Sequence, residues 1–428
     1  MFEKLRVLGI VICSWGCAAE SVSEHAAVGR GAGDLFAARV GHPGRGPWEQ
    51  VPPDRVRDVC HLDEDALAEA DRVLNKPWVA IRYGRLCHEF GAEMPPEESF
   101  SATKILGATT AGAVAYQTLD LERTGRKTGR FSDEDRVDHW IDDFTFHKDA
   151  HVAHVLAMVA QSEDVRYGKR VMEYDYTGIV QLDSLNFMLH AAIAQDPKRL
   201  GGDLEAFVQR FMFGPLGMTQ STWSYGLPNK AFGFSWNTTV LDMARLGQLL
   251  LRHGMVNDTH VVSEEWVYRM THPAFEDANT AMGYCTWLNA AKGFTTGTMP
   301  TPASWTELTS QPRFPGPCAP LSVYREHPHG LSESPDCGYG SARSCELPHD
   351  VGVWQSIAGF GSVIQGHPGL DLVLVGWQLT PEDFFGLGAA GKLWDAVRPA
   401  VIAADPTFPG DEAAFCTEYG NNRYAPDL

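Results

Sequence analysis

The segment from Phe100 to Gln117 is the feature that most constrains the fold. It predicts a helix dominated by small residues, namely Gly107, Ala108, Ala111, Gly112, Ala113 and Ala115. A helix that is small and apolar on every side is expected to be buried and packed closely against its neighbours. The chain must therefore build a large core around it, and 428 residues suffice for one large domain or two interleaved ones.

The first turn of this helix carries Ser101 and Lys104, an S-x-x-K pattern. A hydroxyl is a weak nucleophile and needs a neighbour that accepts its proton. Residues three apart share a helix face, so Lys104 can reach the Ser101 hydroxyl, and burial lowers the pKa of a lysine. By itself the pattern is often a helix cap beside a solvated lysine. The burial of this helix is what favours the catalytic interpretation.

Strand patterns lie at both ends of the chain and helical patterns lie between them. A helix is predicted over 63–74, followed by a hairpin over 78–83 and 86–90. Further helices are predicted over 151–161, 182–194, 204–213, 240–253 and 264–270, strands over 352–357, 361–365 and 370–378, and a last helix over 384–404. This order predicts one sheet built from both chain ends with a helical region inserted between its halves.

The segment Phe100-Ser101-Ala102-Thr103-Lys104 resembles the nucleophile motif of the serine β-lactamase-like and penicillin-binding-protein family, which includes class C β-lactamases, DD-peptidases and carboxylesterases. Later segments resemble further motifs in the family's order: His154–Met158 (H-L-L-x-M), Glu173–Gly178 (F-x-Y-S-N-T-G), Phe213–Met218 (the PLGM turn), Thr238–Gly254 (T-T-x-x-D-M-A-R-F-G) and Gly283–Leu288 (Y-G-Y-G-W-W-L). The resemblance covers roughly residues 75 to 380. It implies an α/β (α+β) three-layer sandwich, with an antiparallel sheet flanked by helices, and no cofactor or metal.

The resemblance also implies roles for two tyrosines. Tyr174 takes the place of the family's second-motif tyrosine, which near Lys104 could pass the proton of Ser101 to the leaving group. Tyr176 stands where the family usually has Asn, and it is the reserve candidate for the base if the register is displaced. This departure puts recognition of a β-lactam or peptide amide in doubt.

The third family motif, usually K-T-G on a late strand, is replaced here. Lys127-Thr128-Gly129 falls in a charged connection and reads as a surface loop, whereas Ser356-Ile357-Ala358 on the late strand matches the A-S-G variant of esterase-like members. The oxyanion donors would then be the backbone N–H groups of Ser101 and Gly359. Tyr176, Ser356 and Trp287 are the candidates for the substrate pocket, although an aromatic residue at the position of Trp287 is as often core.

These residues predict a serine hydrolase that acts through an acyl-enzyme on a small ester or amide. Loss of the K-T-G lysine removes the cation that binds a substrate carboxylate, so penicillins and D-Ala-D-Ala peptides are less favoured. A penicillin-binding DD-carboxypeptidase or β-lactamase remains the enzymatic alternative, and a non-catalytic binding protein on the same fold is the other. His147, His151 and His154 have a spacing that could present metal ligands, but no carboxylate pattern completes a site.

The N-terminus predicts export. Residues 1–19 read as a signal peptide, and Ser14-Trp15-Gly16-Cys17 leaves open a lipoprotein site at which an acylated Cys17 would be the one membrane attachment. The expected location is the periplasm or cell envelope. The formal net charge of −19 argues against nucleic-acid binding.

The remaining chain divides by composition. A Gly- and Pro-rich stretch over 20–57 reads as a flexible linker, 58–405 as the hydrolase domain with an irregular insertion at about 291–350, and 406–428 as a C-terminal tail. In an exported protein the cysteines can form disulfides. A local bridge among Cys318, Cys337 and Cys345 is the first expectation, while the oligomeric state and the pairing as a whole are left open.

Overall fold

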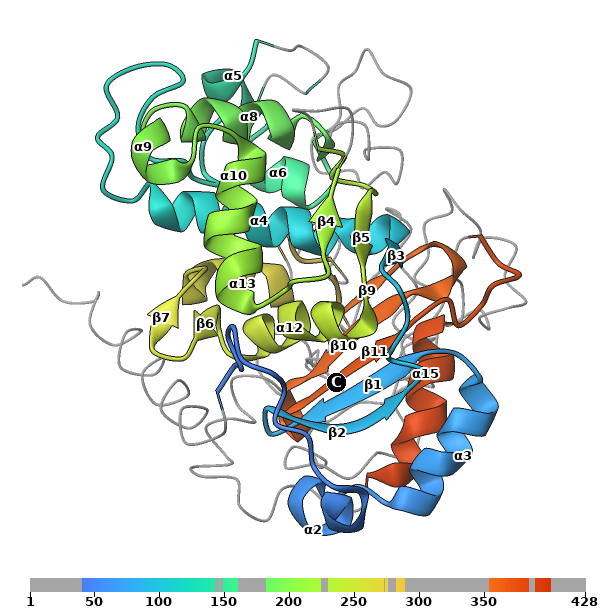
Figure 1. The fold of residues 1–428 in the computed structure, drawn as a ribbon. Helices are drawn as coiled ribbons and strands as arrows, with labels where there is room; N and C mark the ends of the chain where they lie inside the picture. Colours follow the sequence, from blue (N-terminus) through green and yellow to red (C-terminus); the bar gives the residue numbers. More distant parts are fainter. Residues whose placement is uncertain are drawn as a thin grey trace, which may run out of the picture.

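A six-stranded antiparallel sheet lies at the centre of the computed structural model (Figure 1), which describes residues 41–142, 146, 149–160, 182–224, 230–272, 274–275, 282–288, 354–384 and 389–401. The strand order is β2-β1-β11-β10-β9-β8. Their bounds are β1 Trp78–Arg82, β2 Arg85–Phe90, β8 Trp287–Leu288, β9 Trp354–Ile357, β10 Val363–His367 and β11 Leu372–Gly376. Strands from the two parts of the chain meet where β1 pairs with β11, as predicted.

Both faces of this sheet are apolar and each is covered by helices. Trp78 and Ala80 of β1 point into the core formed with α3 (Glu64–Leu74) and α15 (Ala389–Val397). Val79 and Ile81 point the other way, toward α12 (Val240–Leu251) and the helices beyond it. Helices, sheet and helices thus form the three layers of the predicted α/β sandwich, visible in Figure 1.

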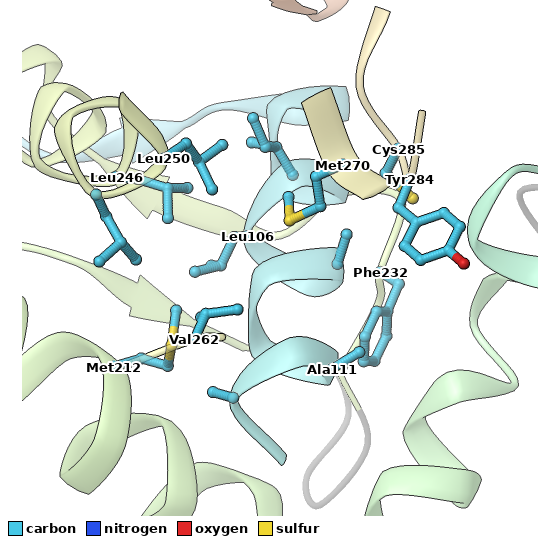
Figure 2. Close-up of a cluster of buried hydrophobic side chains, with 14 of the residues drawn as sticks. Leu106, Ala111, Met212, Phe232, Leu246, Leu250, Val262, Met270, Tyr284 and Cys285 are labelled. Atoms are coloured by element: carbon cyan, nitrogen blue, oxygen red, sulfur yellow. The ribbon is translucent and has the colours of Figure 1, made fainter. Parts of the chain in front are cut away.

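The inserted helical region surrounds α4 (Thr103–Gln117), whose residues are buried from Thr103 to Val114. Its glycines explain this burial: a Cβ on Gly107 would lie 2.5 Å from the Phe232 ring, and one on Gly112 would lie 2.4 Å from Trp266. Figure 2 shows α4 enclosed by apolar side chains from neighbouring segments, Phe232 among them. The prediction of a buried small-residue helix is confirmed.

The other described elements are short. The helices are α2 Val56–Cys60, α5 Val137–Trp140, α6 Val152–Leu156, α8 Leu185–Ile193, α9 Pro197–Leu200, α10 Leu204–Val208, α11 Gly214–Leu216 and α13 Glu264–Thr271. A second sheet joins β3 (Glu97–Glu98), β5 (Trp236–Thr238) and β4 (Thr222–Trp223), and β6 (Met255–Val256) pairs with β7 (Thr259–His260). None of the described helices is both long and apolar enough to cross a membrane.

The predicted linker is wrong over residues 41–57, which pack on the domain. His42 is buried, and Arg245 of α12 donates to the carbonyl oxygens of Gly44 (2.6 Å) and Gly46 (2.8 Å). Val51 and Val56 join the core beneath the sheet. The Gly and Pro content of this stretch suggested a mobile segment. Its backbone carbonyl groups instead accept hydrogen bonds from the buried guanidinium of Arg245, which holds the stretch on the domain. We call residues 41–57 the N-terminal strap.

One disulfide, Cys60–Cys87, links α2 to β2. Composition predicted that disulfides can form but gave no sign of this pair. The bridge expected among Cys318, Cys337 and Cys345 lies outside the described residues, as do the leader, the 291–350 insertion and the tail.

Candidate active site

Ser101 lies in a tight 3-10 turn, Phe100–Ala102, that leads directly into α4. The turn is fixed to β5 on its N-terminal side, because the N–H of Ser99 donates to the Trp236 carbonyl at 2.9 Å. The carboxylate of Glu98 accepts from the Phe100 N–H at 2.8 Å. These bonds hold the backbone around Ser101 before any ligand binds.

Lys104 approaches Ser101 as the i, i+3 spacing predicts. Its Nζ lies 2.7 Å from the Ser101 Oγ, and its side chain is buried. Burial lowers the pKa of Lys104 to about 8, although the negative charge of the nearby Asp183 carboxylate opposes the shift. About half of this amine is therefore neutral at pH 8, and a smaller fraction at pH 7, in the form that can accept the serine proton.

Two residues that the sequence reasoning missed lie near Lys104. The Asp183 carboxylate accepts from the Phe232 N–H at 2.8 Å, and burial raises the pKa of Asp183 while this bond opposes the increase. The Cys285 thiol donates to the Leu156 carbonyl at 3.2 Å, and burial raises the pKa of Cys285 to about 12. A thiol with that pKa is neutral where Lys104 titrates, so of these two neighbours it is Asp183 that contributes negative charge.

The two residues differ in how visible they were in the sequence. Asp183 stands at the start of a predicted helix, where an aspartate reads as a cap, so nothing local pointed to Lys104. Cys285 stands where the resembled strand motif has Gly, and its φ of 53° is in the left-handed region that glycine favours. That substitution was the one available signal.

Gly359 lies beside the nucleophile turn, as the predicted oxyanion arrangement requires. A Cβ on Gly359 would lie 2.8 Å from the Phe384 carbonyl oxygen and 3.5 Å from Phe100 Cγ, so no larger residue fits without displacement. Among the described residues, no carbonyl accepts from the N–H of Ser101 or of Gly359. Both amides are therefore available to an oxyanion.

Ser356 lies on the sheet face that looks toward α4. It shares this face of β9 with Trp354, a member of the core cluster that contains α4, while Gln355 between them faces α15 through its partner Gln365. Ser356 is buried at the position of the family's third motif, and it carries no charge. The late strand thus contributes backbone and a small hydroxyl side chain to this region.

The remaining candidates are placed as follows. Tyr174 and Tyr176 lie outside the described residues. Trp287 of β8 is paired with Gln355 of β9, so the Trp287 side chain lies on the same side of the sheet as Gln355 and on the side opposite to Ser356. Trp287 also packs against the cluster that contains Met158. This register gives no support to Trp287 as a pocket residue.

The Lys-Thr-Gly run lies on the surface, as predicted. Lys127 is exposed and forms an ion pair with Asp142 at 2.8 Å. Within the described part of the chain no group of three His, Cys, Asp or Glu side chains is arranged to hold a metal ion. Of the three histidines with ligand-like spacing, His154 accepts from the backbone N–H of His151 at 3.0 Å, and His147 is not described.

Comparison with known proteins gives matches at the level of structure. No family model and no curated protein matches the sequence. A β-lactamase from Mycobacterium bovis is 17% identical and is similar over 82% of this chain and 99% of its own, with a TM-score of 0.44. A mutant of simvastatin synthase from Aspergillus terreus is 13% identical over 82% and 98%, with a TM-score of 0.45.

A third solved structure, the octameric penicillin-binding protein homologue from Pyrococcus abyssi, is 13% identical over 78% of this chain and 75% of its own, with a TM-score of 0.41. The family resembled by the sequence motifs thus appears again among the structures that this chain matches. Because identities are below 25% and TM-scores below 0.5, the function proposed below rests on the geometry around Ser101.

Proposed function

We propose that this protein is a serine hydrolase that forms an acyl-enzyme at Ser101 with a small ester or amide. The observation that carries the proposal is the 2.7 Å contact between Ser101 Oγ and the buried Nζ of Lys104, whose pKa is lowered to about 8. A lysine at this depth that contacts a hydroxyl on a fixed turn supplies a base where a nucleophile needs one.

The reaction has two halves. Ser101 Oγ attacks the substrate carbonyl as its proton passes to the Lys104 amine, and the carbonyl oxygen is stabilised by the N–H groups of Ser101 and Gly359. The proton then reaches the leaving group as the bond to it breaks, a transfer for which Tyr174 is the proposed carrier. Water attacks the acyl-enzyme in the second half, which releases the acid and restores Ser101.

Small neutral substrates are favoured by the late strand. Ser356 stands where the resembled family usually has the lysine that binds a substrate carboxylate, and it is buried and uncharged. An enzyme that hydrolyses a penicillin or a D-Ala-D-Ala peptide is therefore the second candidate function. A binding protein that does not catalyse a reaction is the third. The Cys60–Cys87 disulfide supports the proposal that the protein is exported to an oxidising compartment.

The test is intact-mass analysis after exposure to a fluorophosphonate and, separately, to a penicillin. We expect one fluorophosphonate adduct on the wild-type protein and none on Ser101→Ala. Ser99→Ala is the matched control, because it removes a nearby hydroxyl that has no hydrogen-bond partner among the described residues. Ser99→Ala should label like the wild type.

The penicillin arm separates the enzymatic alternatives, since a stable adduct at Ser101 would favour the penicillin-binding function. No adduct with either reagent, on protein shown to be folded by circular dichroism, would overturn the hydrolase proposal in favour of a binding protein.

A further inference from the structure

Three phenylalanine rings lie in series beside the two proposed oxyanion donors. The rings of Phe100 and Phe360 are 5.1 Å apart at 66°, and those of Phe360 and Phe384 are 5.4 Å apart at 86°. Both are edge-to-face contacts, the geometry in which aromatic pairs attract most. We call these three residues the phenylalanine wall.

The backbone of the wall is strained at two positions. Phe100 has a φ of 50° and Phe360 a φ of 59°, a region that bulky residues rarely adopt. The surroundings hold both: Glu98 accepts from the Phe100 N–H at 2.8 Å, and the Phe360 carbonyl accepts from Thr380 N–H at 3.0 Å. Strain of this kind persists where neighbouring contacts over-determine the conformation, and it concentrates at functional sites.

The wall is tied to the oxyanion donors by sequence as well as by contact. Phe100 directly precedes Ser101, and Phe360 directly follows Gly359. A Cβ on Gly359 would lie 3.6 Å from Phe100 Cβ, so the two donor segments touch through the wall. A substrate whose carbonyl oxygen is held between the two amides would therefore have one of the groups on its carbonyl carbon close to these rings.

The wall is apolar and partly open to solvent. Phe384 is 57% exposed, whereas Phe100 and Phe360 are half-buried. The carboxylate of Glu98 accepts from the backbone N–H groups of Phe100 (2.8 Å) and Ser235 (2.7 Å), while Glu382 and Asp383 precede Phe384 in the chain. An exposed aromatic surface beside a reactive serine suits a neutral apolar group of a ligand.

We infer that Phe100, Phe360 and Phe384 bind the apolar side of the substrate and select esters or amides whose acyl group carries an aromatic ring. This inference rests on the proposed function and names its substrate class. Phe384 is the residue to test, because it is the most exposed of the three and its truncation leaves the strained backbone of the other two in place.

The first measurement is the ratio of kcat/KM for p-nitrophenyl phenylacetate to that for p-nitrophenyl acetate. We expect Phe384→Ala to lower this ratio about tenfold, and Phe384→Leu to lower it less, because leucine keeps an apolar surface. Phe187→Ala is the matched control, since Phe187 on α8 is 56% exposed and lies outside the wall. Its ratio should stay within twofold of the wild type.

A fall of the same size in Phe187→Ala, or an unchanged ratio in Phe384→Ala, would overturn the inference. The second measurement needs no catalysis: dissociation constants of N-methylphenylacetamide and N-methylacetamide are measured by NMR in the Ser101→Ala background. Adding Phe384→Ala should raise the dissociation constant of N-methylphenylacetamide about tenfold relative to that of N-methylacetamide.

The two proposals can fail separately. If Ser101 forms no adduct but the amides are still discriminated through Phe384, the hydrolase proposal fails and the apolar site stands. If Ser101 is labelled but Phe384→Ala weakens the binding of both amides equally, or of neither, the phenylalanine wall does not select the acyl group.

Discussion

At the scale of single residues, the protonation of Lys104 is the property on which the proposed chemistry depends. Burial lowers its pKa to about 8. The Cys285 thiol, with a pKa raised to about 12 by its own burial, carries no charge in that range. Asp183 is held by the Phe232 N–H, and Phe232 packs on α4 at Gly107, so its carboxylate is fixed near the lysine. We therefore expect Asp183 to raise the pKa of the proposed base without contacting the reacting atoms.

The pH dependence of Ser101 labelling tests this role. With neutral Lys104 as the base, the rate of fluorophosphonate labelling should rise with pH through a midpoint near 8. Asp183→Asn keeps an oxygen for the Phe232 N–H but removes the negative charge that favours the ammonium form. The pKa of Lys104 should then fall further, and the midpoint should move about one unit to lower pH.

Cys285→Ser is the control for Asp183→Asn, because the neutral thiol contributes no charge near pH 8. Its midpoint should match the wild type. A midpoint that stays in place in Asp183→Asn and moves in Cys285→Ser would show that the assignment of the charge partner is wrong.

At the scale of elements, α12 joins parts of the molecule that are far apart in the sequence. Arg245 donates to Leu216 O in the predicted PLGM turn at 2.9 Å, and to the N-terminal strap. Asp242 accepts from Ser221 Oγ at 3.0 Å. A Cβ on Gly247 would lie 2.7 Å from Val373 of the sheet, so Gly247 lets the helix pack closely there. The D-M-A-R-L-G segment is thus structural in this chain.

Replacing Arg245 should destabilise the protein without touching the site. Arg245→Lys keeps the charge but loses the planar fork that reaches three carbonyl groups, so we expect about 2–4 kcal/mol lower free energy of unfolding. The free energy of unfolding is measured by urea denaturation, and Arg72→Lys on the exposed side of α3 is the control. The control should change by less than about 0.5 kcal/mol. An equally small change in Arg245→Lys would contradict this role.

At the scale of the whole molecule, the fold is closed by contacts between its first and last described strands. Arg252 and Asp371 form a buried two-bond ion pair (2.6 and 3.0 Å) that ties α12 to the turn before β11. Arg82 on β1 donates to the carbonyls of Leu370 (3.1 Å) and Cys60 (3.0 Å). The Cys60–Cys87 disulfide adds a covalent link at the same edge.

Reduction of this disulfide should lower stability throughout the domain. The two cysteines are 27 residues apart, and in the chain-entropy model a crosslink that closes a loop of this length stabilises the fold by about 3.5 kcal/mol. We expect a reductant to lower the Tm of the wild-type protein by several degrees. The double variant Cys60→Ser and Cys87→Ser should already have the lower Tm and respond little to reductant. A wild-type Tm that is indifferent to reductant would contradict this contribution.

Much of the fold could be predicted from the sequence because it depends on local patterns. The hairpin, the buried small-residue helix and the late strands follow from residue type and period over a few neighbours, and all are observed. The contact between Ser101 and Lys104 was predictable for the same reason, since a helical turn fixes the distance between residues three apart. Motif resemblance added Gly359, whose position beside the nucleophile turn agrees with its proposed role.

The tertiary structure decided what depends on segments distant in the sequence. No local pattern predicts the approach of Asp183 to Lys104, the edge-to-face contacts of Phe360, the Cys60–Cys87 pair or the packing of the N-terminal strap. Each is set by how rigid elements meet in three dimensions, and composition even suggested the opposite for the strap. The sequence by itself therefore determined the contact between the proposed nucleophile and its proposed base, whereas packing determined the charge and the apolar surface around them.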